Sequence, residues 1–438
     1  MSAPALLRAA SDLVGALRSE WFPVDRLQAL QQALLLEQLR HAYANVPFYR
    51  RRWPQDPVEI LRSGAFAELP LVRRETVQAC PEDFLAETGD RHEWRRSKTS
   101  GSTARPLESW LDRRAWQQCK YSLKFRRLLA SGWRPGHRVT IVEAVAREAL
   151  AEHVESYALP GERWLQPRSF LSLFEPTESH LESYRRFRPH HIYAPMSYLA
   201  GLARLWSESD RRNVPLRTLQ TSGEWFHPQT RRRVSERFGV PVLDVYGSTE
   251  FKEIAWQCRE LGGYHVNMES VLVEVLDPSG AAVAPGGAGE VVVTSLTNRA
   301  MPLIRYVTGD RAALLGGSCR CGRESLRLDA FEGRTVDVLA LPDGRRISPY
   351  ALTTAVETCP GVLQYRIVQL ERDRLDVPIV LPGASESALA ALRATLAGVV
   401  GPAVKIDVRV VADLPREPSG KCAPVKLSRP WQTEEGRV

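Results

Sequence analysis

The sequence has few cysteines and no long apolar run near its start. Seven cysteines among 438 residues are too few and too unevenly spaced for the disulfide framework of a small secreted domain. Residues 1–21 include four charged side chains, so this stretch is not apolar enough for a signal-peptide core or a membrane span. We therefore expect a reducing compartment and, by default, a cytoplasmic location.

Internal repeats and low-complexity tracts are not evident either. The chain is too long for one ordinary core, so two or three domains are expected. Its formal net charge of +8 could favour anionic ligands such as nucleotides. The run Arg231-Arg232-Arg233, however, falls in a helix-like stretch and is better interpreted as a solvated face.

Helix-like and strand-like patterns alternate through most of the chain. Apolar residues at helical spacing predict an amphipathic helix over residues 27–43, which Pro47 and the residue before it should end. Later, the apolar run 139–145, the helix-like 181–188 and the short apolar run 240–245 follow one another. This alternation predicts an α/β domain with a partly parallel sheet.

The pattern changes after residue 270. Apolar runs at 271–276 and 289–293, joined by a turn-rich segment, predict a β-hairpin or meander. From about residue 335 to 438, further strand signals and a helix-like run at 386–396 suffice for a small α+β domain of about 100 residues.

A short loop of small residues carries the first chemical signal. It consists of Thr99, Ser100, Gly101, Ser102 and Thr103. Backbone N–H groups and hydroxyls of this kind can surround phosphate oxygens, and glycine permits close approach. The loop is not a Walker A motif, because no Gly-Lys-Ser/Thr follows. Taken alone, it can equally be a plain Ser/Thr-rich linker.

Five further segments, in a fixed order, change that interpretation. They are Thr221-Ser222-Gly223-Glu224, Tyr246-Gly247-Ser248-Thr249-Glu250, Tyr306-Val307-Thr308-Gly309-Asp310, Gly333-Arg334 and the stretch 415–421. Together with the loop, this set closely resembles the adenylate-forming superfamily of acyl-CoA synthetases, and more specifically its phenylacetate-CoA ligase branch. Segments 41–50 and 68–75 are also similar to that branch. The resemblance covers about residues 27–426.

The resemblance implies a fold and a reaction. The fold is a large N-terminal domain of several α/β subdomains, residues 1–334, followed by a small mobile α+β lid domain, residues 335–438. The reaction activates a carboxylic acid with ATP as an acyl-AMP, expels pyrophosphate and passes the acyl group on, with coenzyme A as the expected acceptor. Two anions must meet in this reaction, so Mg²⁺ and hydrogen-bond donors are expected near the phosphates.

Roles for single residues follow from the same resemblance. Ser100, Ser102 and Thr103 match phosphate-binding hydroxyls. Glu250 matches the Mg²⁺ ligand, and a hard carboxylate suits that ion. Further nucleotide-binding positions are implied for Gly101, Glu224, Tyr246 beside adenine, Gly247, Ser248, Thr249, Asp310 at the ribose hydroxyls, and Arg334 at ribose or phosphate.

Lys421 matches the mobile lysine that bridges the carboxylate and the α-phosphate during adenylation. A lysine on a flexible loop suits that role, because it must leave before the second half-reaction. The sequence departs from the family pattern in three places. Ala104 and Arg105 replace the usual glycine and lysine after the loop, and Val336 replaces the usual hinge residue while the next aspartate is kept.

The acid pocket is less clear. Residues 193–198 and 225–226 should lie near it, and their aromatic and apolar side chains are consistent with an aryl or other hydrophobic acid. The same residues would look no different as ordinary core.

A second constellation has the composition of a metal site. Cys258, His265, Cys319 and Cys321 offer three thiolates and one imidazole, which is the set that a closed tetrahedral Zn²⁺ site requires. Some members of the resembled branch carry a similar set. The spacing is not that of a standard finger, so unrelated free cysteines are the alternative. Four protein ligands would leave no open position, so the zinc would be structural.

Two other functions stay open from the sequence. The acyl group could go to an amine or to a carrier-protein thiol instead of coenzyme A, since the adenylation motifs are shared. A zinc-dependent nucleic-acid-binding protein is the more distant alternative. The arginines are scattered and no recognised nucleic-acid module is present, so we expect neither nucleic acid nor membrane as a partner.

Overall fold

The structure is a computed structural model. It describes residues 3–53, 56–98, 107–151, 165–224, 226–329, 339–347, 349–414 and 424–428. The predicted phosphate loop, residues 99–105, lies outside this described part, as do Arg334, Val336 and Lys421. The expected domain boundary at 334/335 lies there too and stays a prediction. None of the helices that the structure describes is long and apolar enough to cross a membrane.

The chain divides into two compact units. Unit 1 comprises residues 1–133 and 243–330, and unit 2 comprises residues 134–242 and 331–438. The two units are described separately below.

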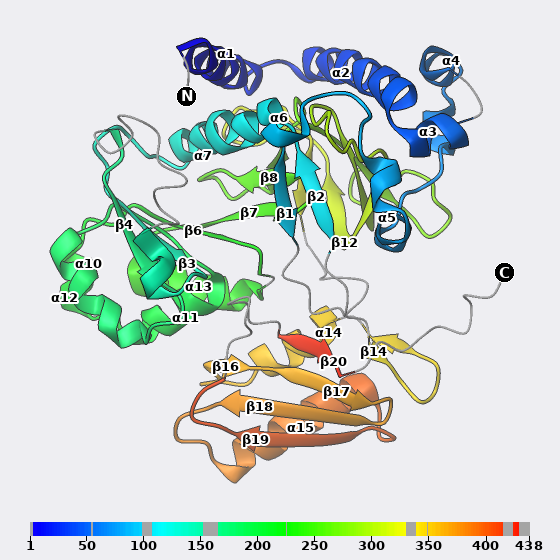
Figure 1. The fold of residues 1–438 in the computed structure, drawn as a ribbon. Coiled ribbons are helices and arrows are strands. Elements are labelled where there is room, and N and C mark those ends of the chain that lie inside the picture. The colour runs from blue at the N-terminus through cyan, green and yellow to red at the C-terminus, as the bar shows by residue number, and fades with distance from the viewer. Residues whose placement is uncertain are drawn as a thin grey trace. The chain divides into compact units, whose positions relative to one another are not determined.

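Unit 1 combines N-terminal helices with an antiparallel sheet (Figure 1). Its helices are α1 (Ala3–Ser19), α2 (Val24–Asn45), α3 (Pro47–Arg52), α4 (Pro57–Arg62), α5 (Arg74–Ala79), α6 (Arg113–Gln117) and α7 (Lys124–Ala130), with a π-helical turn, Gln118–Leu123, between the last two and short 3₁₀ turns at Ala65–Glu68, Pro81–Phe84 and Arg91–Glu93. Its strands are β1 (Arg95–Lys98), β2 (Glu108–Leu111), β7 (Val242–Ser248), β8 (Lys252–Gln257), β9 (Tyr264–Val266), β10 (Val271–Leu276), β11 (Ala288–Ser295), β12 (Tyr306–Leu315) and β13 (Arg327–Asp329).

The main sheet of unit 1 runs in the order β10-β11-β12-β13-β9-β8-β7, with every neighbouring pair antiparallel. The predicted hairpin is confirmed as β10 and β11. β1 and β2 form a separate antiparallel hairpin. The helix predicted over residues 27–43 is confirmed as α2, and it ends where Val46 takes an extended conformation before Pro47.

Helix α2 buries one face, which carries its apolar side chains. Leu27, Leu35, Leu39 and Ala42 lie on that face at helical spacing. Gln38 lies among them, fully buried, and its side chain donates to the backbone carbonyl of Asn298 at 2.6 Å. The helix is thus fixed by apolar packing together with the hydrogen bond that the buried amide NH₂ group of Gln38 donates.

Unit 2 contains a parallel sheet and a separate C-terminal layer. The helices in the described part of residues 134–242 include a 3₁₀ turn at Thr177–His180, α10 (Leu181–Phe187), α11 (Met196–Leu205), α12 (Glu208–Asn213) and α13 (Pro228–Phe238). The strands there are β3 (Val139–Glu143), β4 (Arg168–Ser172), β5 (His191–Tyr193) and β6 (Thr218–Ser222), which are parallel in the order β6-β5-β3-β4. The expectation of a partly parallel α/β sheet is therefore confirmed.

The C-terminal residues form a small α+β layer with its own core. Its elements are β14 (Leu339–Ala340), β15 (Arg346–Ile347), α14 (Pro349–Glu357), β16 (Gln364–Tyr365), β17 (Ile367–Glu371), β18 (Arg374–Val380), α15 (Glu386–Val400), β19 (Lys405–Val410) and β20 (Val425–Leu427). Buried residues from Leu339 to Val425 pack into one apolar cluster. The helix predicted over residues 386–396 is confirmed as α15.

Candidate active site

The strands that flank the predicted phosphate loop contact the segment that follows β7. Lys98 of β1 pairs with Glu108 of β2, so the predicted loop is the connection between these strands. On β2, the Ser109 hydroxyl donates to the carbonyl of Thr249 at 3.1 Å. On β1, Ser97 accepts a hydrogen bond from Lys252 Nζ at 2.6 Å. Two motifs that lie about 150 residues apart in sequence are thereby brought together.

The predicted adenine and ribose residues also meet. Tyr246, on β7, donates from its phenol to Asp310 Oδ2 at 2.9 Å, and Thr308 Oγ1 lies 3.4 Å from the same phenol. Thr308 in turn donates to the Val291 carbonyl on β11. Tyr246 is partly buried. The Tyr246 ring on β7 and the Asp310 carboxylate on β12 are therefore held next to each other by this hydrogen bond.

Glu250 lies in the turn between β7 and β8 and is only 8% exposed. The Tyr306 phenol donates to its Oε1 at 3.3 Å, and an Arg74 guanidinium nitrogen lies 3.9 Å from the same oxygen. Burial raises the pKa of Tyr306, so the phenol stays a neutral donor. Among the described residues no hydrogen bond reaches Glu250 Oε2.

Arg74 was missed as a site residue. It begins α5, inside the segment 68–75 whose resemblance was noted without a role. Its sequence position, far from Glu250, gives no sign of the contact. Two further residues of the motif shape the turn itself: Ser248 Oγ accepts from the Phe251 N–H at 3.2 Å, and Gly247 lies against the backbone of Lys252.

Glu224 lies in unit 2, directly after β6, and holds the start of α11. Its carboxylate accepts from the Ser197 backbone N–H at 2.8 Å and from the Ser197 hydroxyl at 2.9 Å. A carboxylate at a helix N-terminus stabilises that helix. A role for Glu224 in nucleotide binding stays a prediction.

The predicted acid-pocket segment 193–198 is partly core. Met196 and Tyr198 are buried in the apolar cluster of unit 2. The Tyr198 hydroxyl hydrogen-bonds with His180 and with the Tyr184 hydroxyl. These two side chains are thus structural, whereas Tyr193 carries its hydroxyl to Ser222 beside the Glu224 segment.

The four predicted metal ligands converge in unit 1. The ligand atoms of Cys258, His265, Cys319 and Cys321 all lie within 4.8 Å of one another. Cys258 Sγ is 3.7 Å from Cys319 Sγ, and Cys321 Sγ is 3.4 Å from His265 Nε2. Thiolates bound tetrahedrally at about 2.3 Å from a Zn²⁺ ion would lie about 3.8 Å apart. The donor set and the spacing therefore fit zinc.

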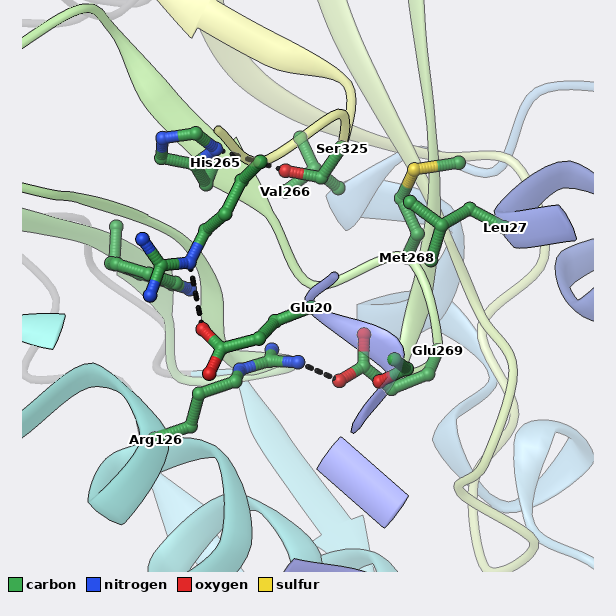
Figure 2. Close-up of a pocket in the computed structure, with 11 residues that line it drawn as sticks. Glu20, Leu27, Arg126, His265, Val266, Met268, Glu269 and Ser325 are labelled. Carbon is green, nitrogen blue, oxygen red and sulfur yellow. Dashed lines mark hydrogen bonds and ion pairs between the residues drawn. The ribbon is translucent and has the colours of Figure 1, made fainter. Parts of the chain in front are cut away.

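The surroundings of this cluster are ordered by hydrogen bonds. His265 Nδ1 pairs with the Ser325 hydroxyl at 3.0 Å (Figure 2). The opposite ring nitrogen, Nε2, lies 3.4 Å from Cys321 Sγ. Burial, helped by the positive charge of Arg323, lowers the pKa of His265 to about 3. At Gly262, an added Cβ would lie 3.0 Å from Cys319 Sγ, so the chain must pass close to the cluster there.

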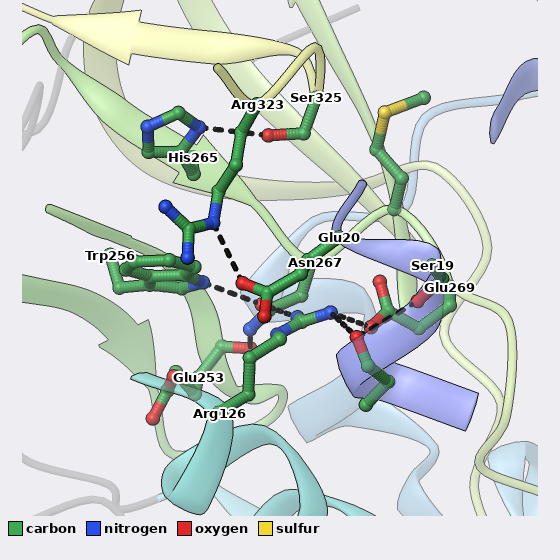
Figure 3. Close-up of polar contacts among 12 residues, drawn as sticks. Ser19, Glu20, Arg126, Glu253, Trp256, His265, Asn267, Glu269, Arg323 and Ser325 are labelled. Carbon is green, nitrogen blue, oxygen red and sulfur yellow. Dashed lines mark hydrogen bonds and ion pairs between the residues drawn. The ribbon is translucent and has the colours of Figure 1, made fainter. Parts of the chain in front are cut away.

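Beside the cluster lies a network of buried charges (Figure 3). Arg323 donates to Glu20 at 2.7 Å, just beyond the end of α1. Arg126, 3% exposed, donates to Glu269 and to Asn267. A cavity of ≈ 10 Å³, about the size of one water, lies among these side chains. Removing one partner of a buried ion pair leaves an uncompensated charge, which strongly lowers the stability of the folded protein.

Comparison with known proteins gives concordant matches. The family model of AMP-binding enzymes matches residues 168–298. The phenylacetate-coenzyme A ligase of Thermus thermophilus is 28% identical over 391 residues, covering 82% of this chain and 81% of that protein. The phenylacetate-coenzyme A ligase of Escherichia coli is 26% identical over 370 residues, covering 80% and 77%. A crystal structure of 2-hydroxyisobutyryl-CoA ligase in the postadenylation state has a TM-score of 0.76 at 24% identity, covering 93% of this chain and 90% of that one.

Proposed function

We propose that this chain, which is similar to AMP-binding enzymes and to phenylacetate-coenzyme A ligases, is a phenylacetate-CoA ligase-like enzyme of the adenylate-forming superfamily. The enzyme activates a carboxylic acid with ATP as an acyl-AMP, releases pyrophosphate and transfers the acyl group to coenzyme A. The observation that supports this proposal is the hydrogen bond between Tyr246 and Asp310, together with the contact of Ser109, on the strand after the 99–103 loop, with Thr249 beside Glu250.

Each end of this site has a role in the first half-reaction. Asp310, held by the Tyr246 phenol, accepts hydrogen bonds from the ribose hydroxyls, and the Tyr246 ring packs on adenine. Glu250 would hold Mg²⁺, and the ion, when bound, would neutralise charge on the phosphates. Arg74 adds a second positive charge beside the same carboxylate, which favours anionic phosphates nearby.

The residues outside the described part complete the proposal through the resemblance. Ser100, Gly101, Ser102 and Thr103 donate to the phosphates, and Arg334 contacts ribose or phosphate. Lys421 bridges the carboxylate and the α-phosphate during adenylation and then leaves with the C-terminal domain, residues 335–438. The acid is expected to be aromatic or otherwise hydrophobic.

The Cys258, His265, Cys319 and Cys321 cluster holds a structural Zn²⁺ in this proposal. The fit of the donor atoms to a tetrahedral site and the Ser325 contact of His265 support it. A cytoplasmic location belongs to the proposal as well, and cell fractionation tests it.

A pyrophosphate-release screen tests the proposed reaction. Purified protein with MgATP is offered a panel of aromatic and aliphatic acids, with and without coenzyme A, and the thioester is followed by mass spectrometry. We expect acid-dependent pyrophosphate release with any preferred acid and thioester formation only with coenzyme A. Pyrophosphate release without thioester, but with amide formation from added amines, would move the acceptor assignment to an amide synthetase. No acid-dependent release from a folded, zinc-replete protein would overturn the proposal.

A further inference from the structure

Lys252, two residues after Glu250, has a strained backbone. Its φ of 63° places it in the left-handed region, which a residue with a Cβ disfavours. Only three other non-glycine residues of the described part share a positive φ. Strain of this kind persists where the surroundings fix it, and it gathers at functional sites.

The neighbouring strand fixes this conformation. Lys252 pairs with Ser248 across the tight β7–β8 turn, next to a register shift between Tyr246 and Gly247. The Lys252 carbonyl approaches Gly247 so closely that an added Cβ there would lie 1.9 Å from the carbonyl oxygen. The turn therefore needs glycine at 247 and holds Lys252 in the left-handed conformation.

The Lys252 side chain reaches the strand that leads into the predicted phosphate loop. Nζ donates to Ser97 Oγ at 2.6 Å, two residues before the predicted loop begins. The ammonium also lies 5.9 Å from the centroid of the Trp116 ring, a distance at which a cation–π attraction operates. Lys252 is only partly exposed.

The positive charge of Lys252 has no ion-pair partner in the part of the chain that the structure describes. The nearby Glu250 attracts it electrostatically but is not within salt-bridge distance. An ammonium has three N–H donors, and Ser97 takes one of them. Two N–H donors and the partly desolvated charge of Lys252 thus lie near Ser97 and Glu250. A bound anion would accept hydrogen bonds from these donors and neutralise the charge.

We propose that Lys252 is a further binding residue for the phosphates of ATP and for the departing pyrophosphate. A compact ammonium suits phosphate oxygens as a point charge. By holding Ser97, Lys252 also ties the end of β1, two residues before the predicted loop, to the β7–β8 turn that carries Glu250. This inference rests on the proposed function and deepens it.

Direct binding of MgATP and of magnesium pyrophosphate, measured by titration calorimetry, tests the proposal. Lys252→Met keeps the length of the side chain and removes its charge, so the Kd for both ligands should rise about tenfold or more. Lys252→Arg should recover part of the affinity. Lys405→Met, which removes an exposed lysine on β19, should leave the Kd unchanged.

Kinetics and stability then separate binding from a merely structural role. In the adenylation assay, Lys252→Met should raise the KM for ATP and leave the KM for the acid unchanged. Lys252→Gly accepts the backbone conformation without strain, so it keeps the protein folded should the methionine variant fail to fold, and it should show the same weak binding. Folded Lys252→Met and Lys252→Gly proteins with wild-type affinity for both ligands would overturn the inference. Because the titration needs no acid substrate, failure of the proposed reaction is distinguishable from failure of the Lys252 assignment.

Discussion

The Tyr246 phenol donates a hydrogen bond to Asp310 Oδ2 at 2.9 Å, across 64 residues of sequence. The bond joins β7 to β12 and fixes the carboxylate toward which the ribose hydroxyls are expected to point. In the proposed mechanism, one residue packs on the base and the other binds the sugar. The bond sets their relative position before the nucleotide arrives, which lowers the ordering cost of binding.

Loss of either carboxylate of the site should abolish most adenylation. We expect Asp310→Ala and Glu250→Ala each to lower acid-dependent pyrophosphate release by about 10²-fold or more, since each removes a positioned charged contact. Tyr246→Phe keeps the ring and loses only the hydrogen bond, so a decrease of about threefold to tenfold is expected. Melting curves should show all three proteins folded, and near-normal release by Asp310→Ala or Glu250→Ala would refute the assignment of that residue.

Gly247→Ala should damage the site through the backbone. The new Cβ would lie 1.9 Å from the Lys252 carbonyl oxygen, so the β7–β8 turn must open and Glu250 must move. We expect a loss of about 1–3 kcal/mol in unfolding free energy together with loss of adenylation. Gly398→Ala is the matched control, because nothing lies within 4 Å of the Cβ position in α15 and alanine favours a helix. A Gly247→Ala enzyme as stable and active as wild type would contradict the observed approach.

The zinc proposal predicts about one zinc per chain by elemental analysis. Cys319→Ser should lose the metal and lower the melting temperature, because metal binding is coupled to folding. Arg323, two residues from Cys321, binds Glu20, so hydrogen exchange near the end of α1 should rise as well. Cys359→Ser changes a buried cysteine outside the cluster and should keep the zinc. Purified wild-type protein without zinc would rule the site out.

Lys421→Ala should separate the two half-reactions. Adenylation needs a cation between the carboxylate and the α-phosphate, so its rate should fall by about 10²-fold or more. Acyl transfer to coenzyme A from a chemically supplied acyl-adenylate should be far less affected, because the lysine must leave before that step. Equal loss of both half-reactions, or of neither, would show that the two-state role of Lys421 is wrong.

Asp210 should make the stability of unit 2 depend on pH. Hydrogen bonds from Arg185 and Ser207 lower the pKa of Asp210 from 3.8 to about 2. The folded state therefore favours the ionised form, and this stabilisation is fully present above about pH 5 and is lost as the pH falls from about 4 to 2. Asp210→Asn should cost about 1–2 kcal/mol at pH 7, discounted for the half-exposed Arg185, and much less at pH 2.

Urea unfolding at pH 7 and at low pH measures that difference. Glu386→Gln breaks an exposed ion pair with Arg393 and should change stability by less than about 0.5 kcal/mol. If Asp210→Asn and Glu386→Gln cost the same at pH 7, the buried pair contributes no special stability.

The sequence by itself determined the helices and strands and the types of ligand group that the chain offers. The helical spacing of Leu27, Leu35 and Leu39 predicted α2, and the alternation of apolar runs predicted the parallel strands of unit 2, because these periods are local properties of the backbone. Two candidate sites could be recognised in the sequence: the motif around Glu250 and the set of three cysteines and one histidine. Residue type and order already specify which ligand groups are available to a metal or nucleotide.

Only the tertiary structure decided which of these groups meet. Arg74 contacts Glu250, 176 residues away in the sequence, and Lys252 contacts Ser97, 155 residues away. No local sequence pattern predicts contacts at such separations. The buried positions of Met196 and Tyr198 likewise follow from the packing of α11, since a core aromatic and a pocket aromatic have the same sequence signal. The strain at Lys252 arises because strand pairing in the β7–β8 turn imposes a φ that the lysine itself disfavours.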